Sequence, residues 1–202
     1  MNDHSLFINF SEGSFTTLFV YVDDIILPGN DQEEIDRVKE ALNKTFNIKD
    51  IGDLRYFLGI EVARNKKWVM MNQRTYALEL LTDAGLLAYK PVVTLMDNVK
   101  LFSIGSVPFR DVHAYKRLIA RLMYLTNTRP DITFSIQQLS KCFDKPTIAY
   151  YKAAIRILKY IKGVGSLSLF FSSNSFVYLK AFCNIDWGTC NHSRQSVTIF
   201  CV

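Results

Sequence analysis

The chain has 202 residues, which is enough for one large domain or two small ones. Hydrophobic residues make up 49% of it, so the composition supports a real core and excludes an intrinsically disordered protein. The net charge of +5 suits a polyanionic partner such as nucleic acid, but charge alone does not specify one.

The N-terminal part predicts a tight hairpin that presents two acids. His4–Phe10 and Thr16–Val22 are expected to be strands, the second because it is rich in β-branched and aromatic residues. Asp23 and Asp24 then interrupt the apolar run, and Ile25–Leu27 resumes it. This pattern indicates a hairpin with two carboxylates at its tip.

An amphipathic helix and a second hairpin are predicted next. Apolar residues at helical spacing favour a helix over Asp31–Thr45, with Asn30 and Glu33 as a capping box. The later elements are the strands Leu54–Ala63 and Trp68–Asn72, the helix Arg74–Ala84 ended by Gly85, and the extended connection Lys90–Phe109.

The C-terminal half predicts helices followed by strands. The expected helices are Val112–Asn127, Asp131–Phe143 and Thr147–Ile161, and the expected strands are Leu167–Phe171, Val177–Phe182 and Ser196–Val202. Hairpins and helices that follow one another in this way indicate an α+β fold. No apolar stretch approaches the roughly 18 residues that span a bilayer, and no signal peptide is recognisable, so we expect an intracellular protein without a membrane partner.

The acidic tip is the strongest candidate for chemistry. Phosphoryl transfer with two metal ions needs carboxylates on a rigid support, and a hairpin tip carrying Asp23 and Asp24 offers one. An ordinary Asp-Asp turn is the alternative. Cys183, Cys190 and His192 could be imagined as zinc ligands, but their spacing matches no common zinc pattern.

Several segments, in order along nearly the whole chain, resemble copia-type retrotransposon reverse transcriptases. They are Phe19–Leu27, Ile51–Leu54, Tyr56–Glu61, Asn72–Ala77, Asp83–Leu86, Lys90–Pro91, Tyr124–Ile132 and Leu158–Gly163. The resemblance implies an RNA-directed DNA polymerase that binds an RNA or DNA template–primer and uses Mg²⁺. Asp23 would be a metal ligand with Asp24 beside it, and Tyr21 and Val22 would lie near the primer end.

The resemblance also implies a division of the chain. Residues 1–72 would form a partial palm with the YVDD hairpin and a primer-grip-like hairpin at Phe57–Asn72. Residues 73–130 would hold thumb-like helices and a linker, residues 131–165 connection helices, and residues 166–202 the start of a truncated RNase H-like domain. In that last part Asn184 stands where the family carries its first catalytic Asp, and an amide binds a divalent metal far more weakly.

Two stripes of basic residues could contact phosphates. Lys116, Arg117 and Arg121 lie at helical spacing on the thumb-like helix, as do Lys152, Arg156 and Lys159 on the last helix. Since such stripes are also typical of an ordinary solvated helix face, both interpretations stay open.

Whether a polymerase of this family is active depends on a further catalytic acid upstream of the hairpin. A polymerase of this family needs another Asp upstream, and only Asp3 and Glu12 precede Tyr21. We therefore expect an inactive fragment. The alternatives are one half of a split polymerase completed by another chain, and a nucleic-acid-binding module. The sequence leaves the oligomeric state open.

Overall fold

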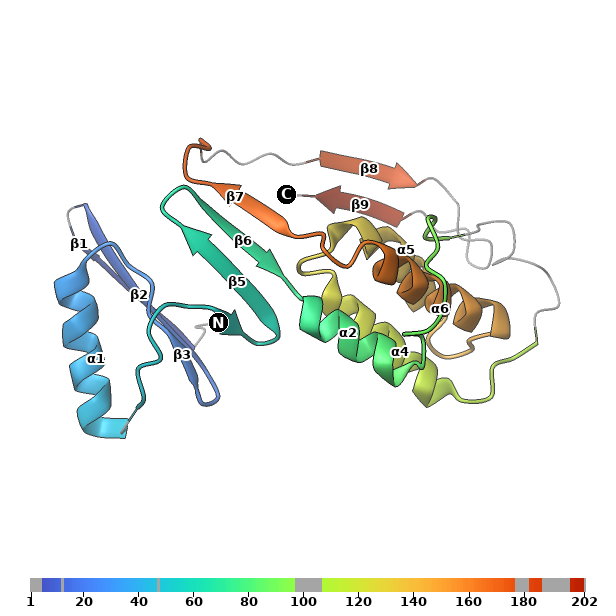
Figure 1. Cartoon of the computed structure of the whole chain (residues 1–202), viewed down its shortest axis with the longest axis horizontal. Helices are drawn as coiled ribbons and strands as arrows, with labels where there is room; N and C mark the ends of the chain where they lie inside the picture. The colour runs from blue at the N-terminus through green and yellow to red at the C-terminus, as the bar shows by residue number, and fades with distance from the viewer. Residues whose placement is uncertain are drawn as a thin grey trace. The chain divides into compact units, whose positions relative to one another are not determined.

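The protein forms an α+β structure, as predicted, with antiparallel sheets and packed helices (Figure 1). The computed structural model describes residues 5–11, 13–46, 48–96, 107–176, 182–186 and 197–201. The chain divides into two compact units, Met1–Leu58 and Gly59–Val202.

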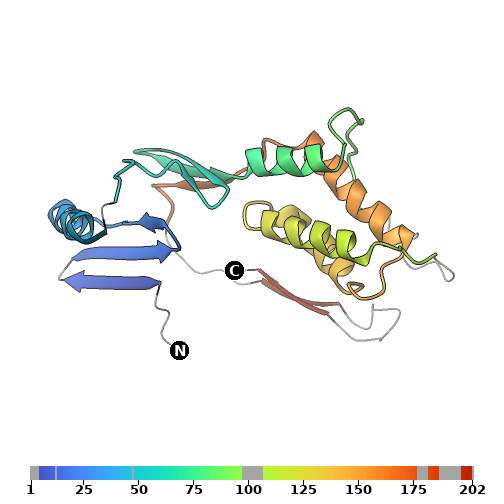
Figure 2. The ribbon, with the colours of Figure 1, turned by 90° about the horizontal axis from the view of Figure 1, so that it is seen from below.

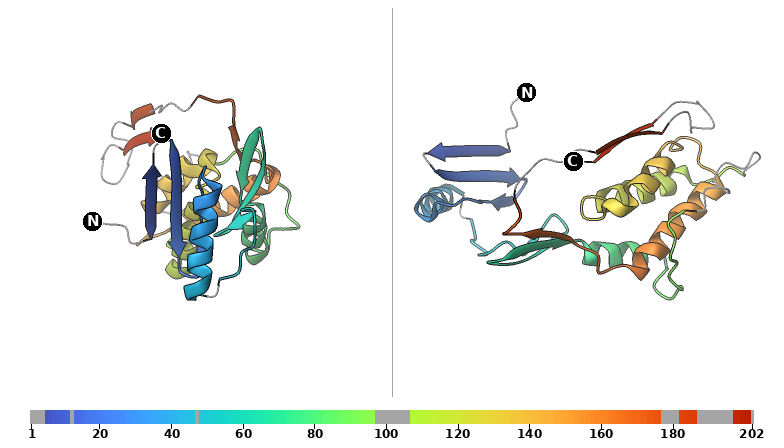
Figure 3. Two further views of the ribbon diagram at one scale, coloured as in Figure 1. Left: turned by 90° about the vertical axis from the view of Figure 1, so that its left-hand side faces the viewer. Right: turned by 90° about the horizontal axis from the view of Figure 1, so that it is seen from above.

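The first unit is a small sheet with one helix. Strands β1 (Leu6–Ser11), β2 (Ser14–Tyr21) and β3 (Asp24–Ile26) are antiparallel in the order β1-β2-β3. Helix α1 (Gln32–Phe46) lies against one face of this sheet (Figure 3), and the short strand β4 (Tyr56–Phe57) ends the unit. Ile35, at 9% exposure, is the buried apolar residue of α1, so this unit has only a small core of its own among the described residues.

The start of α1 differs from the predicted capping box. Asp31, rather than Asn30, caps the helix, because its carboxylate accepts a hydrogen bond from the backbone N–H of Glu34 at 3.1 Å. The Ser14 hydroxyl donates a second hydrogen bond to Asp31 at 3.1 Å. These hydrogen bonds, the backbone one first, lower the pKa of the Asp31 carboxyl. The cap therefore also joins α1 to the start of β2.

The second unit contains a further antiparallel sheet in which β6 is paired on both sides. Its strands are β5 (Ile60–Asn65), β6 (Trp68–Asn72) and β7 (Leu169–Ser172). The strand predicted over Leu54–Ala63 is wrong in its middle, where Leu58 (φ 47) and Gly59 (φ 76) turn into the left-handed region and end the extended backbone. β7 joins this sheet although almost a hundred residues separate it from β6.

The helices of the second unit pack into its main core (Figure 2). They are α2 (Arg74–Asp83), α4 (Val112–Leu125), the 3-10 turn η1 (Pro130–Ile132), α5 (Thr133–Ser140) and α6 (Ile148–Gly163). α2 and α5 each pack against both α4 and α6, and the side chains of Ile119, Leu139 and Ile157 at their centre are completely buried. The helix predicted over Asp131–Phe143 is shorter, because a 3-10 turn replaces its start.

A partly buried ion pair connects the turn that follows α4 with the C-terminal part of α6. The Arg129 guanidinium donates to both carboxylate oxygens of Asp131, at 2.8 and 2.7 Å, and to the carbonyl oxygen of Val164 at 3.2 Å. The Tyr160 hydroxyl donates to the same carboxylate at 3.1 Å. The Thr-Arg-Pro-Asp-Ile sequence, part of the family-like segment Tyr124–Ile132, therefore has a structural role in this chain: it connects the turn after α4 with α6.

The last strands form a separate antiparallel pair, β8 (Phe182–Asp186) and β9 (Val197–Cys201). Asn184 lies in β8 opposite Ile199. Most of the strand predicted over Val177–Phe182, and the two zinc candidates Cys190 and His192, lie outside the described residues.

Candidate functional site

The paired acids lie at a strained two-residue turn between β2 and β3. Tyr21 pairs with Asp24 across the hairpin, so Val22 and Asp23 form the turn and Asp24 is the first residue of β3. Val22 has φ 55, whereas Asp23 does not have a positive φ. A positive φ at the first central position alone is the pattern of a type II′ turn, which favours glycine there. A β-branched valine in this conformation stores backbone strain.

The turn is open to a ligand. Val22 is 86% exposed and Tyr21 48% exposed, and the two carboxylates are also exposed. Carboxylate oxygens are the ligands that Mg²⁺ prefers, and one or two of them with substrate phosphates make a usual site. The chemistry of the pair Asp23 and Asp24 therefore fits this metal.

The described residues bring no third acid to this pair. Within them, no group of three or more His, Cys, Asp or Glu side chains lies close enough together to hold a metal ion. The upstream acids Asp3 and Glu12 lie outside the described residues. The part of the chain that the structure describes thus supplies two carboxylates at the turn.

A close backbone approach holds the hairpin beside α1. Gly29 bridges to Thr16, and a methyl group at Gly29 would lie 2.7 Å from the carbonyl oxygen of Phe15. The Asn30 side chain accepts from the backbone N–H of Phe15 at 2.7 Å and donates to the carbonyl oxygen of Gly13 at 3.0 Å. The sequence suggested Asn30 only as part of a capping box, and its contacts with Gly13 and Phe15 became visible only in three dimensions.

Carboxylates neutralise much of the basic stripe on α4. Lys116 pairs with Asp144 at 2.9 Å, and Arg121 pairs with Asp83 at 2.6 Å. Arg117 is exposed, and among the described residues no ion pair is found for it. The three basic residues of this stripe therefore share a helix, as predicted, but two of them already have acidic partners.

Basic residues of α6 hold the segment that connects α2 with α4. We call residues 87–96 of this segment the strap. Arg156 donates to the carbonyl oxygen of Thr94 at 3.1 Å, and Lys162 donates to that of Tyr89 at 2.5 Å. The Lys159 ammonium lies 4.6 Å from the centre of the Tyr89 ring. Sequence reasoning placed two of these cations on a stripe but missed Lys162 and the strap.

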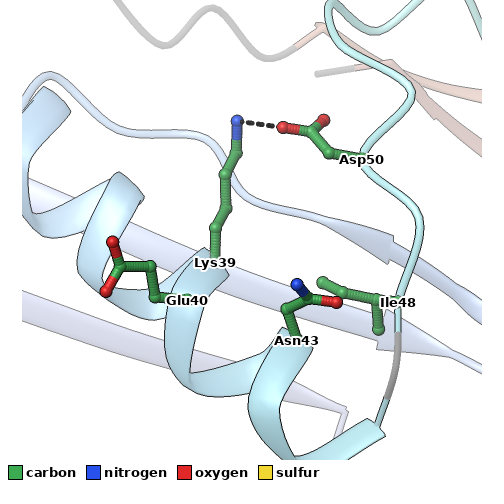
Figure 4. A pocket seen from close by; sticks show the side chains of 5 residues that line it. All are labelled: Lys39, Glu40, Asn43, Ile48 and Asp50. Carbon is green, nitrogen blue, oxygen red and sulfur yellow. Dashed lines mark hydrogen bonds and ion pairs between the residues drawn. The ribbon is translucent and has the colours of Figure 1, made fainter.

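A hollow of about 180 Å³ lies at the C-terminal part of α1, in the first unit. Figure 4 shows Lys39 reaching from α1 towards Asp50, with which it forms an ion pair at 2.9 Å. This hydrogen bond raises the pKa of Lys39 and lowers that of Asp50. The hollow is lined by Lys39, Glu40, Asn43, Ile48 and Asp50, so it contains neither acid of the turn.

Comparison with known proteins confirms the family resemblance. The family model for reverse transcriptase (RNA-dependent DNA polymerase) matches residues 2–98. A mitochondrial protein of Arabidopsis thaliana described as uncharacterised is 34% identical over 91% of this chain and 77% of its own length. The retrovirus-related Pol polyprotein from transposon RE2 of the same plant is 34% identical over 93% of this chain. The Pol polyprotein from transposon TNT 1-94 of Nicotiana tabacum is 28% identical over 95% of it.

The match covers only a small part of the polyproteins. The chain spans 13% of the RE2 polyprotein and 15% of the TNT 1-94 polyprotein. No solved structure matches the chain. Among the helices in the described ranges, none is long and apolar enough to cross a membrane.

Proposed function

Because the chain belongs to the reverse transcriptase family of copia-type retrotransposon Pol polyproteins, we propose that it is part of an RNA-directed DNA polymerase. We propose further that these 202 residues do not extend a primer by themselves. Their partner is an RNA or DNA template–primer, and they contribute two carboxylates of the metal site and surfaces that touch the duplex.

Each candidate residue has a role in this proposal. Asp23 and Asp24 hold Mg²⁺, which would neutralise charge on the phosphates during phosphoryl transfer. Tyr21 and Val22, which flank and form the turn, are the residues proposed to lie beside the primer end. The hairpin of β5 and β6, within Phe57–Asn72, is the primer grip.

The observation that supports inactivity is the number of acids at the turn. Two adjacent carboxylates meet there, and the described residues supply no third. Two-metal phosphoryl transfer depends on positioned charge, so an incomplete set of ligands removes most of the catalysis. Residues 166–202 are proposed as the start of an RNase H-like domain that Asn184 leaves without its first carboxylate, so we expect no RNase H cleavage either.

A primer-extension assay tests the proposal. The full 202-residue chain is incubated with an RNA template, a DNA primer, deoxynucleotides and Mg²⁺, beside the variant Asp23→Asn. We expect the same background signal from both proteins. Extension by the natural chain that Asp23→Asn abolishes would refute inactivity and would show that the site is complete.

A second candidate function is one half of a split polymerase. The specific observation in its favour is the exposed acidic turn, which retains both acids and the strained Val22. Strain of this kind persists where surrounding structure enforces it and is typical of functional sites. Adding the preceding polymerase segment of a Pol polyprotein as a separate chain should then restore extension, and Asp23→Asn in this chain should remove it again. No extension in the mixture would exclude this candidate.

A further inference from the structure

We propose that α6 and the strap together form a binding face for the phosphate backbone of nucleic acid, distinct from the acidic turn and from the stripe on α4. The class of partner rests on the proposed function, whereas the position of the face rests on charges and contacts within the second unit. The two basic stripes were equivalent in the sequence, and the contacts of the two helices distinguish them.

The first argument is the local charge. α6 contains four basic residues and no Asp or Glu. Residues 152, 156 and 159 are separated by four and three positions, so they lie on one side of the helix. The strap adds Lys90 and likewise contains no acid. The Asp131 carboxylate accepts a hydrogen bond from Tyr160 of the same helix, but Arg129 balances its charge. A surface on which one sign predominates concentrates the field that attracts a polyanion.

The second argument is the nature of the partners. Arg156 bonds the carbonyl and hydroxyl oxygens of Thr94, at 3.1 and 2.5 Å, and Lys162 bonds the carbonyl oxygens of Leu87 and Tyr89, each at 2.5 Å. These acceptors are neutral, so they orient the cations without cancelling their charge. On α4 the partners of two cations are carboxylates, which do cancel it. Phosphate oxygens, which carry charge, make stronger hydrogen bonds with such cations than neutral oxygens do.

The third argument is that the strap is held close to the helix. The backbone N–H of Val92 donates to the carbonyl oxygen of Lys159 at 3.3 Å, and a methyl group at Gly163 would lie 3.1 Å from Cβ of Pro91. The cations are therefore presented by a fixed surface. Tyr89, under the Lys159 ammonium, is 54% exposed and adds a ring on which a base can stack.

Fluorescence anisotropy with a labelled 20-nucleotide oligothymidylate tests this face. The variant Lys159→Gln/Lys162→Gln removes two cations of α6, and the matched control Lys44→Gln/Lys141→Gln removes two exposed cations elsewhere. Each phosphate contact on a single strand contributes about 0.7 to the salt slope, so losing two lowers the slope by about 1.4. Between 50 and 200 mM salt the natural chain should then lose about sevenfold more affinity than the α6 variant. The control should keep the natural slope.

Acylation of lysines in the natural chain gives a second measurement that depends on no variant. Oligothymidylate at 50 mM salt should protect Lys152 and Lys159, while Lys44 and Lys141 react as before. Binding without protection of α6, or an α6 variant with the natural slope, would overturn this inference and leave the proposed function with contacts elsewhere. Absence of any binding by the natural chain would overturn the inference and the template–primer partner together.

Discussion

The partly buried pair of Arg129 and Asp131, in the turn that follows α4, offers the sharpest test of the fold. Replacing Asp131 by Asn should lower the free energy of unfolding by about 3 kcal/mol. The Arg129 side chain is 5% exposed and gives two hydrogen bonds to this carboxylate, so the variant leaves a buried guanidinium without its counter-charge. Removing one partner of a buried pair costs about 3–5 kcal/mol, and the 30% exposure of Asp131 favours the lower end.

Urea unfolding followed by circular dichroism measures this change. The matched control is Asp144→Asn, which breaks the pair with Lys116 in which the side chains are 43% and 89% exposed. Exposed pairs contribute at most about 1 kcal/mol, so the control should stay near the natural protein. An Asp131→Asn variant as stable as the control would refute the claim that this pair connects the turn after α4 with α6.

The same pair predicts a dependence on pH. Desolvation raises the pKa of the Asp131 carboxyl, but the hydrogen bonds and charge of Arg129 outweigh it, so the pKa lies below its ordinary value. A depressed pKa stabilises the folded state above the unfolded pKa of about 3.9, and this stability is lost as pH falls through the folded pKa. The difference between the natural protein and Asp131→Asn should therefore be full at pH 6 and shrink below about pH 4. A constant difference down to pH 2 would contradict this assignment.

Two glycine substitutions test the candidate site. Val22→Gly should raise the stability of the hairpin by up to about 1 kcal/mol in thermal unfolding, because glycine adopts a φ of 55 without the backbone strain that valine has there. A clear loss of stability would contradict the strain at Val22. Gly29→Ala should destabilise it by about 2 kcal/mol, because the methyl group would lie 2.7 Å from the Phe15 carbonyl oxygen and force the backbone apart. Gly165→Ala is the control, since its nearest contact would be an ordinary 3.6 Å, and equal effects of the two alanines would count against the close approach.

The spacing of apolar residues and the positions of turn residues predicted most helices and strands correctly, because these elements depend on residues that are close in the sequence. The apolar run before Asp23, the helical spacing in α1 and the glycine at position 85, with φ 65, each act within a few residues. The strand predicted over Leu54–Ala63 was wrong because of the backbone conformation of one residue, which the alternation of residue types does not reveal. Leu58 takes a positive φ, a conformation that the residue type itself disfavours.

The sequence by itself determined the family, the α+β class and the acidic hairpin, since these follow from the order of motifs and from the spacing of apolar residues. Only the tertiary structure decided which basic residues have acidic partners. Both stripes look alike in the sequence, yet Lys116 and Arg121 meet carboxylates whereas Arg156 and Lys162 meet neutral oxygens of the strap. The physical reason is distance along the chain. Partners that lie 28 to 75 residues away are chosen by packing, and no local pattern encodes them.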